Sequence, residues 1–145
     1  MTTSLHFHPP KVAIIGTGFV GATFAYTLMI RGLTSEIVLI DVDKKRAEGE
    51  AMDLNHGLSF VRPVKIYAGD YADCKDADII VICAGAAQKP DEKRLKLVYT
   101  NFEVFRDIVP QVARYNQNSI FLIATNPVDI MTYAALKLSG FPANR

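Results

Sequence analysis

The sequence predicts an α/β fold, in which helices cover both faces of a doubly wound parallel sheet of about five strands. Two observations support this prediction. Short apolar runs rich in β-branched residues alternate with longer segments of helical periodicity. The runs are apolar at nearly every position, which is typical of strands buried on both faces. With 145 residues, 50% of them hydrophobic, the chain can bury one such core.

The first elements are a strand, a helix and a second strand. Residues 11–16 (KVAIIG) predict the first strand, and residues 21–32 predict a helix that ends at Gly32. Residues 35–41 (SEIVLID) predict the second strand. Residues 12–30 carry no charge and approach the length of a membrane span. The glycines within them would weaken a continuous helix, so a strand, a turn and a helix are expected instead.

The middle of the chain predicts a helix followed by two strands. Asp43 suits the N-cap of this helix, and Gly57 suits its end. Residues 64–69 (VKIYAG) and 77–85 (ADIIVICAG) then predict the third and fourth strands. No repeat or internal linker interrupts this pattern.

The last third predicts two helices around a fifth strand. The first helix covers about residues 92–115, and the strand covers residues 119–125 (SIFLIAT). The second helix has Pro127 at its first position, where proline is favoured, and ends at Gly140. Apolar residues recur at helical spacing in the first of these helices, namely Leu95, Val98, Phe102, Phe105 and Val109.

Composition excludes several classes of protein. A net charge of +1 provides no field for nucleic acid or an acidic membrane surface. Cys74 and Cys83 lack the spacing of a metal or redox motif, and Cys83 is expected to be buried. A reducing, cytoplasmic setting is therefore expected. Residues 1–10 predict a loose tail, and residues 11–145 a single domain. The tail holds His6 and His8, which alone do not predict a metal site.

Residues 16–21 (GTGFVG) match the pattern G-x-G-x-x-G between a predicted strand and a predicted helix. Gly16 allows a tight turn, Gly18 lets a pyrophosphate approach the backbone, and Gly21 lets helix and strand pack closely. The start of the helix adds unpaired N–H groups and about half a positive charge. This context predicts a Rossmann-type dinucleotide site.

Asp41 lies 20 residues beyond Gly21, at the end of the next predicted strand. A carboxylate there accepts hydrogen bonds from the ribose hydroxyls and repels a 2′-phosphate, which favours NAD over NADP. Residues 44–46 (KKR) are the opposing observation, because a basic cluster could bind that phosphate. Basic residues that open a helix usually face solvent, so NAD is favoured. A methyltransferase, which also has a glycine turn and an acid, remains an alternative at this point.

The later loops are more specific. Residues 83–101 (CAGAAQKPDEKRLKLVYTN), 124–133 (ATNPVDIMTY) and 52–57 (MDLNHG) resemble the N-terminal domain of bacterial L-lactate dehydrogenases. The resemblance extends over residues 11–145, and a methyltransferase would have no reason to carry these loops. It implies binding of NAD and, in the whole enzyme, interconversion of lactate and pyruvate.

The resemblance implies roles for three residues at the substrate. Residues 88–94 would form a lid over the substrate. Gln88 would face the methyl group of the substrate, where a malate dehydrogenase has an arginine. Arg94 would polarise the ketone, and Asn126 would orient the substrate oxygen. The lid departs from the family pattern at Asp91, where glycine is usual, and this replacement would stiffen a hinge that must move.

The resemblance also implies what the chain lacks. The family takes its catalytic histidine, the aspartate that orients it and its carboxylate-binding arginine from the second half of the enzyme, and His56 is not placed to serve. We therefore expect an enzyme half that binds NAD without turnover. The alternatives are a stand-alone, non-catalytic dinucleotide-binding module and a malate dehydrogenase-like fragment. Cofactor contacts are expected from Gly16, Gly18, Phe19, Val20, Gly21, Asp41, Ala84, Gly85 and Asn126.

A homo-oligomer is also expected. Without a sixth strand, residues 119–125 would form an apolar edge with unpaired backbone groups, which favours pairing with another chain. The helix around Asp53, which in the family packs against a partner subunit, is the second possible contact. Both routes give a two-fold dimer as the simplest product.

Overall fold

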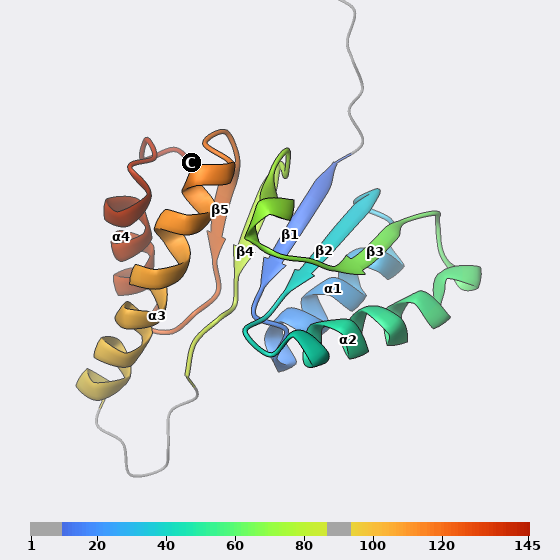
Figure 1. Cartoon of the computed structure of the whole chain (residues 1–145), viewed down its shortest axis with the longest axis horizontal. Helices are drawn as coiled ribbons and strands as arrows, with labels where there is room; N and C mark the ends of the chain where they lie inside the picture. The colour runs from blue at the N-terminus through green and yellow to red at the C-terminus, as the bar shows by residue number, and fades with distance from the viewer. Residues whose placement is uncertain (1–9, 87–93) are drawn as a thin grey trace, which may run out of the picture.

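A computed structural model describes residues 10–86 and 94–145, with the exception of the side chain of Arg94. Within these ranges, five parallel strands form one sheet in the order β3–β2–β1–β4–β5, as predicted (Figure 1). The central strand β1 pairs with β2 on one side and β4 on the other. The strands are β1 (Lys11–Ile15), β2 (Glu36–Ile40), β3 (Lys65–Ala68), β4 (Ile79–Ile82) and β5 (Ile120–Ile123).

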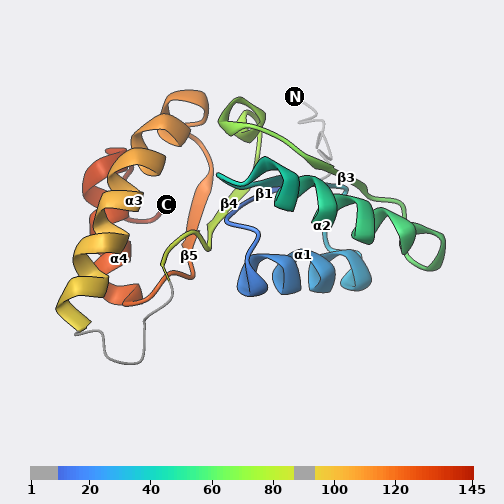
Figure 2. The same cartoon turned by 60° about the horizontal axis from the view of Figure 1, so that its bottom comes forward.

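Helices pack against both faces of the sheet (Figure 2). One face carries α1 and α2, and the opposite face carries α3 and α4. The helices are α1 (Phe19–Arg31), α2 (Lys44–His56), α3 (Arg94–Tyr115) and α4 (Val128–Ser139), with short 3-10 turns at Leu58–Phe60 and Tyr71–Cys74.

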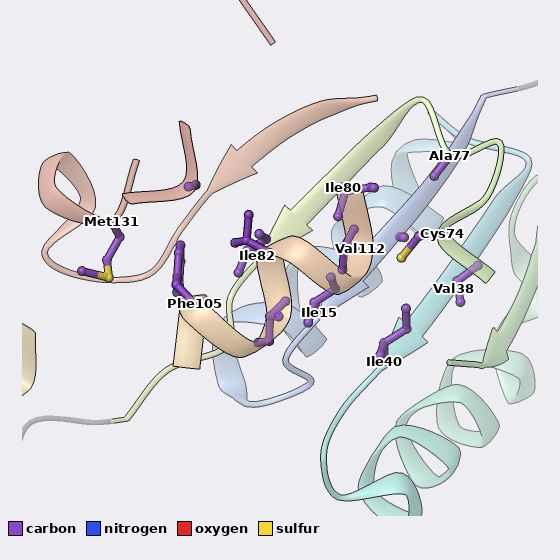
Figure 3. Close-up of a cluster of buried hydrophobic side chains, with 14 residues drawn as sticks. Ile15, Val38, Ile40, Cys74, Ala77, Ile80, Ile82, Phe105, Val112 and Met131 are labelled. Carbon is purple, nitrogen blue, oxygen red and sulfur yellow. The ribbon is translucent and has the colours of Figure 1, made fainter. Parts of the chain in front are cut away.

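The alternation of side chains along the strands divides the core into two clusters. Ile14 of β1 belongs to the cluster that contains Met29 of α1. The next residue, Ile15, points to the other face, into the cluster that contains Phe105 of α3 and Met131 of α4 (Figure 3). The strands are therefore apolar on both faces because both faces of the sheet are packed.

The predicted helix ends are largely confirmed. Asp43 caps α2 by accepting a hydrogen bond from the N–H of Arg46, and Gly57 follows the last residue of this helix. Gly32 ends α1 in the left-handed conformation that glycine favours. The predicted start of α1 was two residues late, because the helix begins at Phe19. Pro127 is the N-cap of α4 rather than its first helical residue.

The apolar stripe predicted for α3 is partly wrong. Phe105 and Val109 are fully buried, but Leu95 is 71% exposed. The buried face instead runs back through Asn101 to Leu97, because these residues share the side of the helix that faces the sheet. A polar residue thus lies on the buried face where the sequence suggested apolar residues alone.

The edge strand β5 also departs from the prediction. Ile120 and Leu122 are 50% and 41% exposed. The helices α1 and α2 pack over the other four strands and leave β5 uncovered on that face of the sheet. The outer edge was expected to have lost its hydrogen-bond partners. However, the N–H of Phe121 donates to the carbonyl of Arg145 at 2.7 Å. The edge is therefore partly occupied by the chain itself.

The uncharged residues 12–30 divide between β1, a turn and α1, as predicted. In the two described ranges, no helix combines the length and the apolar character of a membrane span.

Candidate functional site

A cavity of about 610 Å³ lies at the carboxyl ends of β1, β2 and β4. Since β2 and β4 flank β1, this is the point where the strand order of the sheet reverses. Ligands of doubly wound sheets bind at such points. Gly16 and Gly18 from the first turn line the cavity together with Asp41 after β2 and Ala84 and Gly85 after β4. Three separate segments singled out in the sequence therefore meet at one place.

The three glycines of the first turn are required for different reasons. A Cβ atom at Gly16, where φ is +95°, would lie 2.5 Å from the backbone nitrogen of Ala84. A Cβ atom at Gly21 would lie 1.9 Å from the carbonyl oxygen of Gly16, so α1 can approach β1 only with glycine there. A Cβ atom at Gly18 would meet nothing within 4 Å. Gly18 therefore borders open space, as expected for a backbone that a ligand approaches.

The start of α1 offers an anion-binding group. Gly18 is its N-cap, no side chain among the described residues caps it, and its first turn contains no acidic residue. Its first N–H groups and the positive end of its dipole are thus available to an anion. The side chains of Phe19 and Val20, which were predicted to contact a cofactor, line a separate groove on α1 and are not among the residues that line the cavity. Only their backbone N–H groups could serve.

The carboxylate of Asp41 is held by backbone groups and by one side chain. Its Oδ2 accepts hydrogen bonds from the N–H of Thr17 at 2.7 Å and from its hydroxyl at 3.0 Å, and its Oδ1 accepts from the N–H of Asp43 at 2.9 Å. Burial alone would raise the pKa of Asp41, but these hydrogen bonds and the charge of Arg46 hold it below its ordinary value. Asp41 is therefore a fixed negative charge on the cavity wall.

Two of the basic residues 44–46 have different surroundings. Lys44 forms an ion pair with Asp70, with 2.8 Å between Nζ and Oδ1, and does not line the cavity. Arg46 does line the cavity. The one basic residue of this cluster on the cavity wall thus lies beside the carboxylate of Asp41.

The far wall of the cavity contains residues that sequence reasoning missed. Tyr71, Glu103 and Asp107 line it, the last two from α3. Burial and the charge of Asp107 raise the pKa of Tyr71. The prediction for Cys83 is partly confirmed, because this residue packs against the core but is only partly buried and lines the cavity, whereas Cys74 is fully buried. Burial raises the pKa of the Cys83 thiol.

Asn101 of α3 connects the loops after β4 and β5. Its Oδ1 accepts from the N–H of Ala86 at 2.7 Å, and its Nδ2 donates to the carbonyl of Asn126 at 2.7 Å. The side chain is 1% exposed. The sequence could have revealed this role, because Asn101 lies four residues from both Leu97 and Phe105 and a lone polar residue on a buried helical face needs hydrogen-bond partners.

None of the residues predicted to act on a substrate is among the described residues that line the cavity. Asn126 lines a second groove of about 570 Å³, formed by the first turns of α3 and α4. The bond between Asn126 and Pro127 is cis. Gln88 and Asp91 lie outside the described residues. Arg94 begins α3, and its backbone places it at the end of that helix nearest the second groove.

In the described part of the chain, the cavity has no histidine in its lining. Among residues 10–86 and 94–145, no group of three His, Cys, Asp or Glu side chains could hold a metal ion. His56 is the last residue of α2 and is exposed. His6 and His8 lie outside the described residues.

Comparison with known proteins agrees with this geometry. A family model described as "lactate/malate dehydrogenase, NAD binding domain" matches residues 10–145. The L-lactate dehydrogenase of Acetivibrio thermocellus is 59% identical over 135 residues, and L-lactate dehydrogenase 1 of Clostridium acetobutylicum is 56% identical. These alignments cover 93% of this chain and 43% of each relative. The chain thus spans less than half the length of the curated relatives that it matches.

Solved structures give the same result. The minor L-lactate dehydrogenase from Enterococcus mundtii, in a ligand-bound form, superposes with a TM-score of 0.91 at 45% identity. It matches 94% of this chain and 44% of its own. A lactate dehydrogenase from a deep-sea metagenome library has a TM-score of 0.87 at 49% identity. The chain therefore belongs to the NAD-binding domains of the lactate/malate dehydrogenases.

Proposed function

We propose that the 610 Å³ cavity binds the adenosine and pyrophosphate of NAD(H). The observation that carries the proposal is that Gly18 and Asp41 line the same cavity. Gly18 offers backbone that borders open space, and Asp41 offers a carboxylate held in place by hydrogen bonds. The pyrophosphate would bind the N–H groups at the start of α1. The ribose hydroxyls would donate to Asp41. Ala84 and Gly85 would border the cofactor where it passes the end of β4.

The parent reaction is the interconversion of lactate and pyruvate. Gln88 supports lactate rather than malate, because a neutral amide could not pair with the second carboxylate of a malate-type substrate. Arg94 would stabilise the charge that develops on the substrate oxygen, and Asn126 would orient that oxygen. The groove beside the first turns of α3 and α4 provides the apolar walls for such a small acid.

The chain alone would bind the cofactor without turnover. Hydride transfer to pyruvate needs a proton donor within hydrogen-bond reach of the substrate oxygen. His56, the histidine in the described ranges, ends a helix of 13 residues whose other end begins near the cavity. Roughly 20 Å of helix therefore separates it from the site.

The setting and assembly follow from the same family. We infer a cytoplasmic protein whose residues 11–145 act as one cofactor-binding domain. A homo-oligomer would form either through β5 or through the surface of α1 and α2 around Asp53. The second route is supported by the exposed apolar residues Tyr26 and Ile30 on α1, which are 53% and 50% exposed.

Titration calorimetry with NADH and NADPH tests the proposed function. NADH should bind with modest affinity and NADPH more weakly by about tenfold or more, because a 2′-phosphate would meet the charge of Asp41. Asp41→Ala should weaken NADH and reduce this preference. Equal affinity of the unmutated chain for both cofactors would disprove the role of Asp41, and a lack of binding to either would disprove the proposed site.

A further inference from the structure

Thr17 has a side chain that the glycine pattern does not require. It occupies the variable position between Gly16 and Gly18 and is 1% exposed. Its hydroxyl donates to Oδ2 of Asp41 at 3.0 Å, and its own N–H donates to the same oxygen at 2.7 Å. The two residues are 24 positions apart, so this contact ties the turn after β1 to the turn after β2.

The contact fixes the orientation of the carboxylate. The N–H of Asp43 holds Oδ1 at 2.9 Å while Thr17 holds Oδ2, so rotation of the group would break hydrogen bonds at both oxygens. The titratable neighbours of Asp41 are Arg46 and Tyr71, which line the same cavity. Without the Thr17 hydroxyl, Oδ2 would keep the N–H of Thr17 as its donor, and the carboxylate would be less firmly held beside the charge of Arg46.

We propose that Thr17 is a positioning residue that sets the preference of this site for NAD(H) over NADP(H) by holding the Asp41 carboxylate toward the ribose. The inference rests on the proposed function of the cavity. A fixed carboxylate presents aligned acceptors to the two ribose hydroxyls, and it repels a 2′-phosphate from a constant position. A carboxylate that turns toward Arg46 does both less well. Thr17 therefore acts through Asp41 and touches no reacting atom.

Substitutions at Thr17 separate this role from a purely structural one. Thr17→Val keeps the shape and the backbone N–H but removes the hydroxyl, and Thr17→Ser keeps the hydroxyl. In calorimetry, Thr17→Val should weaken NADH by about tenfold while leaving NADPH nearly unchanged, since the lost hydrogen bond involves a charged acceptor. Thr17→Ser should restore the preference to within about threefold of the unmutated chain. An equal weakening of both cofactors would overturn the proposal, because a distorted turn lowers both affinities alike.

A second measurement does not depend on the cofactor. NMR titration of the Asp41 carboxyl carbon in the cofactor-free chain should show a higher pKa in Thr17→Val and a return toward the original pKa in Thr17→Ser. If the unmutated chain binds no NADH, the proposed function fails, and this titration still decides whether Thr17 holds Asp41. An unchanged pKa in Thr17→Val would overturn the positioning role. Thr17→Ala, measured in the same way, replaces the valine variant if that variant does not fold.

Discussion

The side-chain amide of Asn101 donates a hydrogen bond to the backbone carbonyl of Asn126, with 2.7 Å between the two atoms. The same amide group accepts from the N–H of Ala86, also at 2.7 Å. One buried side chain of α3 thus fixes the ends of β4 and β5 relative to each other. This arrangement holds Asn126, the residue proposed to orient the substrate oxygen, in a fixed position relative to Ala86 at the end of β4.

Replacement of Asn101 should therefore destabilise the fold. Asn101→Ala removes both hydrogen bonds and leaves the N–H of Ala86 without its partner, so the free energy of unfolding should fall by about 2 kcal/mol. Urea denaturation followed by circular dichroism measures this change. Gln111→Ala is the matched control, since among the described residues the Gln111 side chain bonds only to Asp107 of the same helix, and it should change stability by less than about 0.5 kcal/mol. A similar loss in both variants would contradict the role given to Asn101.

Gly18 should be needed for binding but not for folding. Gly18→Ser places a side chain in the open space beside the turn, and its hydroxyl can accept hydrogen bonds from the N–H groups at the start of α1. We expect unchanged or slightly higher stability and at least a tenfold loss of NADH affinity (about 1.4 kcal/mol). Thermal unfolding and calorimetry on the same sample measure the two effects.

Gly49 provides the control for this substitution. It lies within α2, and a Cβ atom there would meet nothing within 4 Å. Gly49→Ala should raise stability by about 0.5 to 1 kcal/mol, because glycine is a poor helix former, and should leave NADH binding unchanged. Binding lost in Gly49→Ala, or retained in Gly18→Ser, would argue against an anion site at the start of α1.

These contacts show how far the sequence could predict the site. Gly16 and Gly18 directly follow β1, and Asp41 directly follows β2. This local pattern was enough to predict the turn and the meeting of these residues at one cavity. Thr17 and Asn101 act through partners 24 and 25 residues away, and no local pattern specifies such pairs. The exposure of Leu122 likewise depends on how far α1 and α2 extend across the sheet, which periodicity along one strand does not contain.

Glu36 should make the fold sensitive to acid. Its Oε1 accepts from the Tyr67 hydroxyl at 2.8 Å and pairs with Lys11 at 3.2 Å and Lys65 at 3.7 Å. Burial alone would raise the pKa of Glu36, but these partners lower it below the ordinary value of 4.5. Because the folded pKa is the lower one, the stabilisation is complete above the unfolded pKa and is lost as the pH falls through the folded pKa.

Glu36→Gln tests this linkage. The variant should be less stable than the unmutated chain by about 1 kcal/mol near pH 7, and the difference should shrink as the pH falls below 4.5. Urea denaturation at a series of pH values measures it. Glu50→Gln on α2, away from this cluster, should follow the unmutated chain throughout. A difference that is constant with pH would mean that the charge of Glu36 does not stabilise the fold.

The chain alone should show no measurable turnover. We expect neither lactate oxidation nor pyruvate reduction, because His56 lies at the exposed end of α2 and cannot reach a substrate beside Asn126. NADH absorbance at high protein concentration is the measurement. Turnover that disappears in Arg94→Ala would show that another group of this chain supplies the proton.

Two surfaces of the described structure could form a contact between two copies of the chain, namely the edge strand β5 and the surface of α1 and α2. The edge strand β5 exposes Leu122, but the N–H of Phe121 on that edge already donates to the carbonyl of Arg145. Pairing with another strand would have to displace this contact. The surface of α1 and α2 needs no such displacement. It contains a groove of about 370 Å³ lined by Tyr26 and Asp53, and Tyr26 is 53% exposed.

We therefore expect a dimer through α1 and α2. Sedimentation velocity should show a dimer for the unmutated chain and a largely monomeric Tyr26→Lys variant, because losing the aromatic ring and burying an ammonium group would weaken the contact by about tenfold or more. Leu122→Lys adds the same charge to the β5 surface and should leave the dimer intact. Loss of the dimer in Leu122→Lys alone would place the contact at the sheet edge. A monomer at high concentration in the unmutated chain would rule out association through either surface, and the exposed apolar residues of α1 would then need another partner.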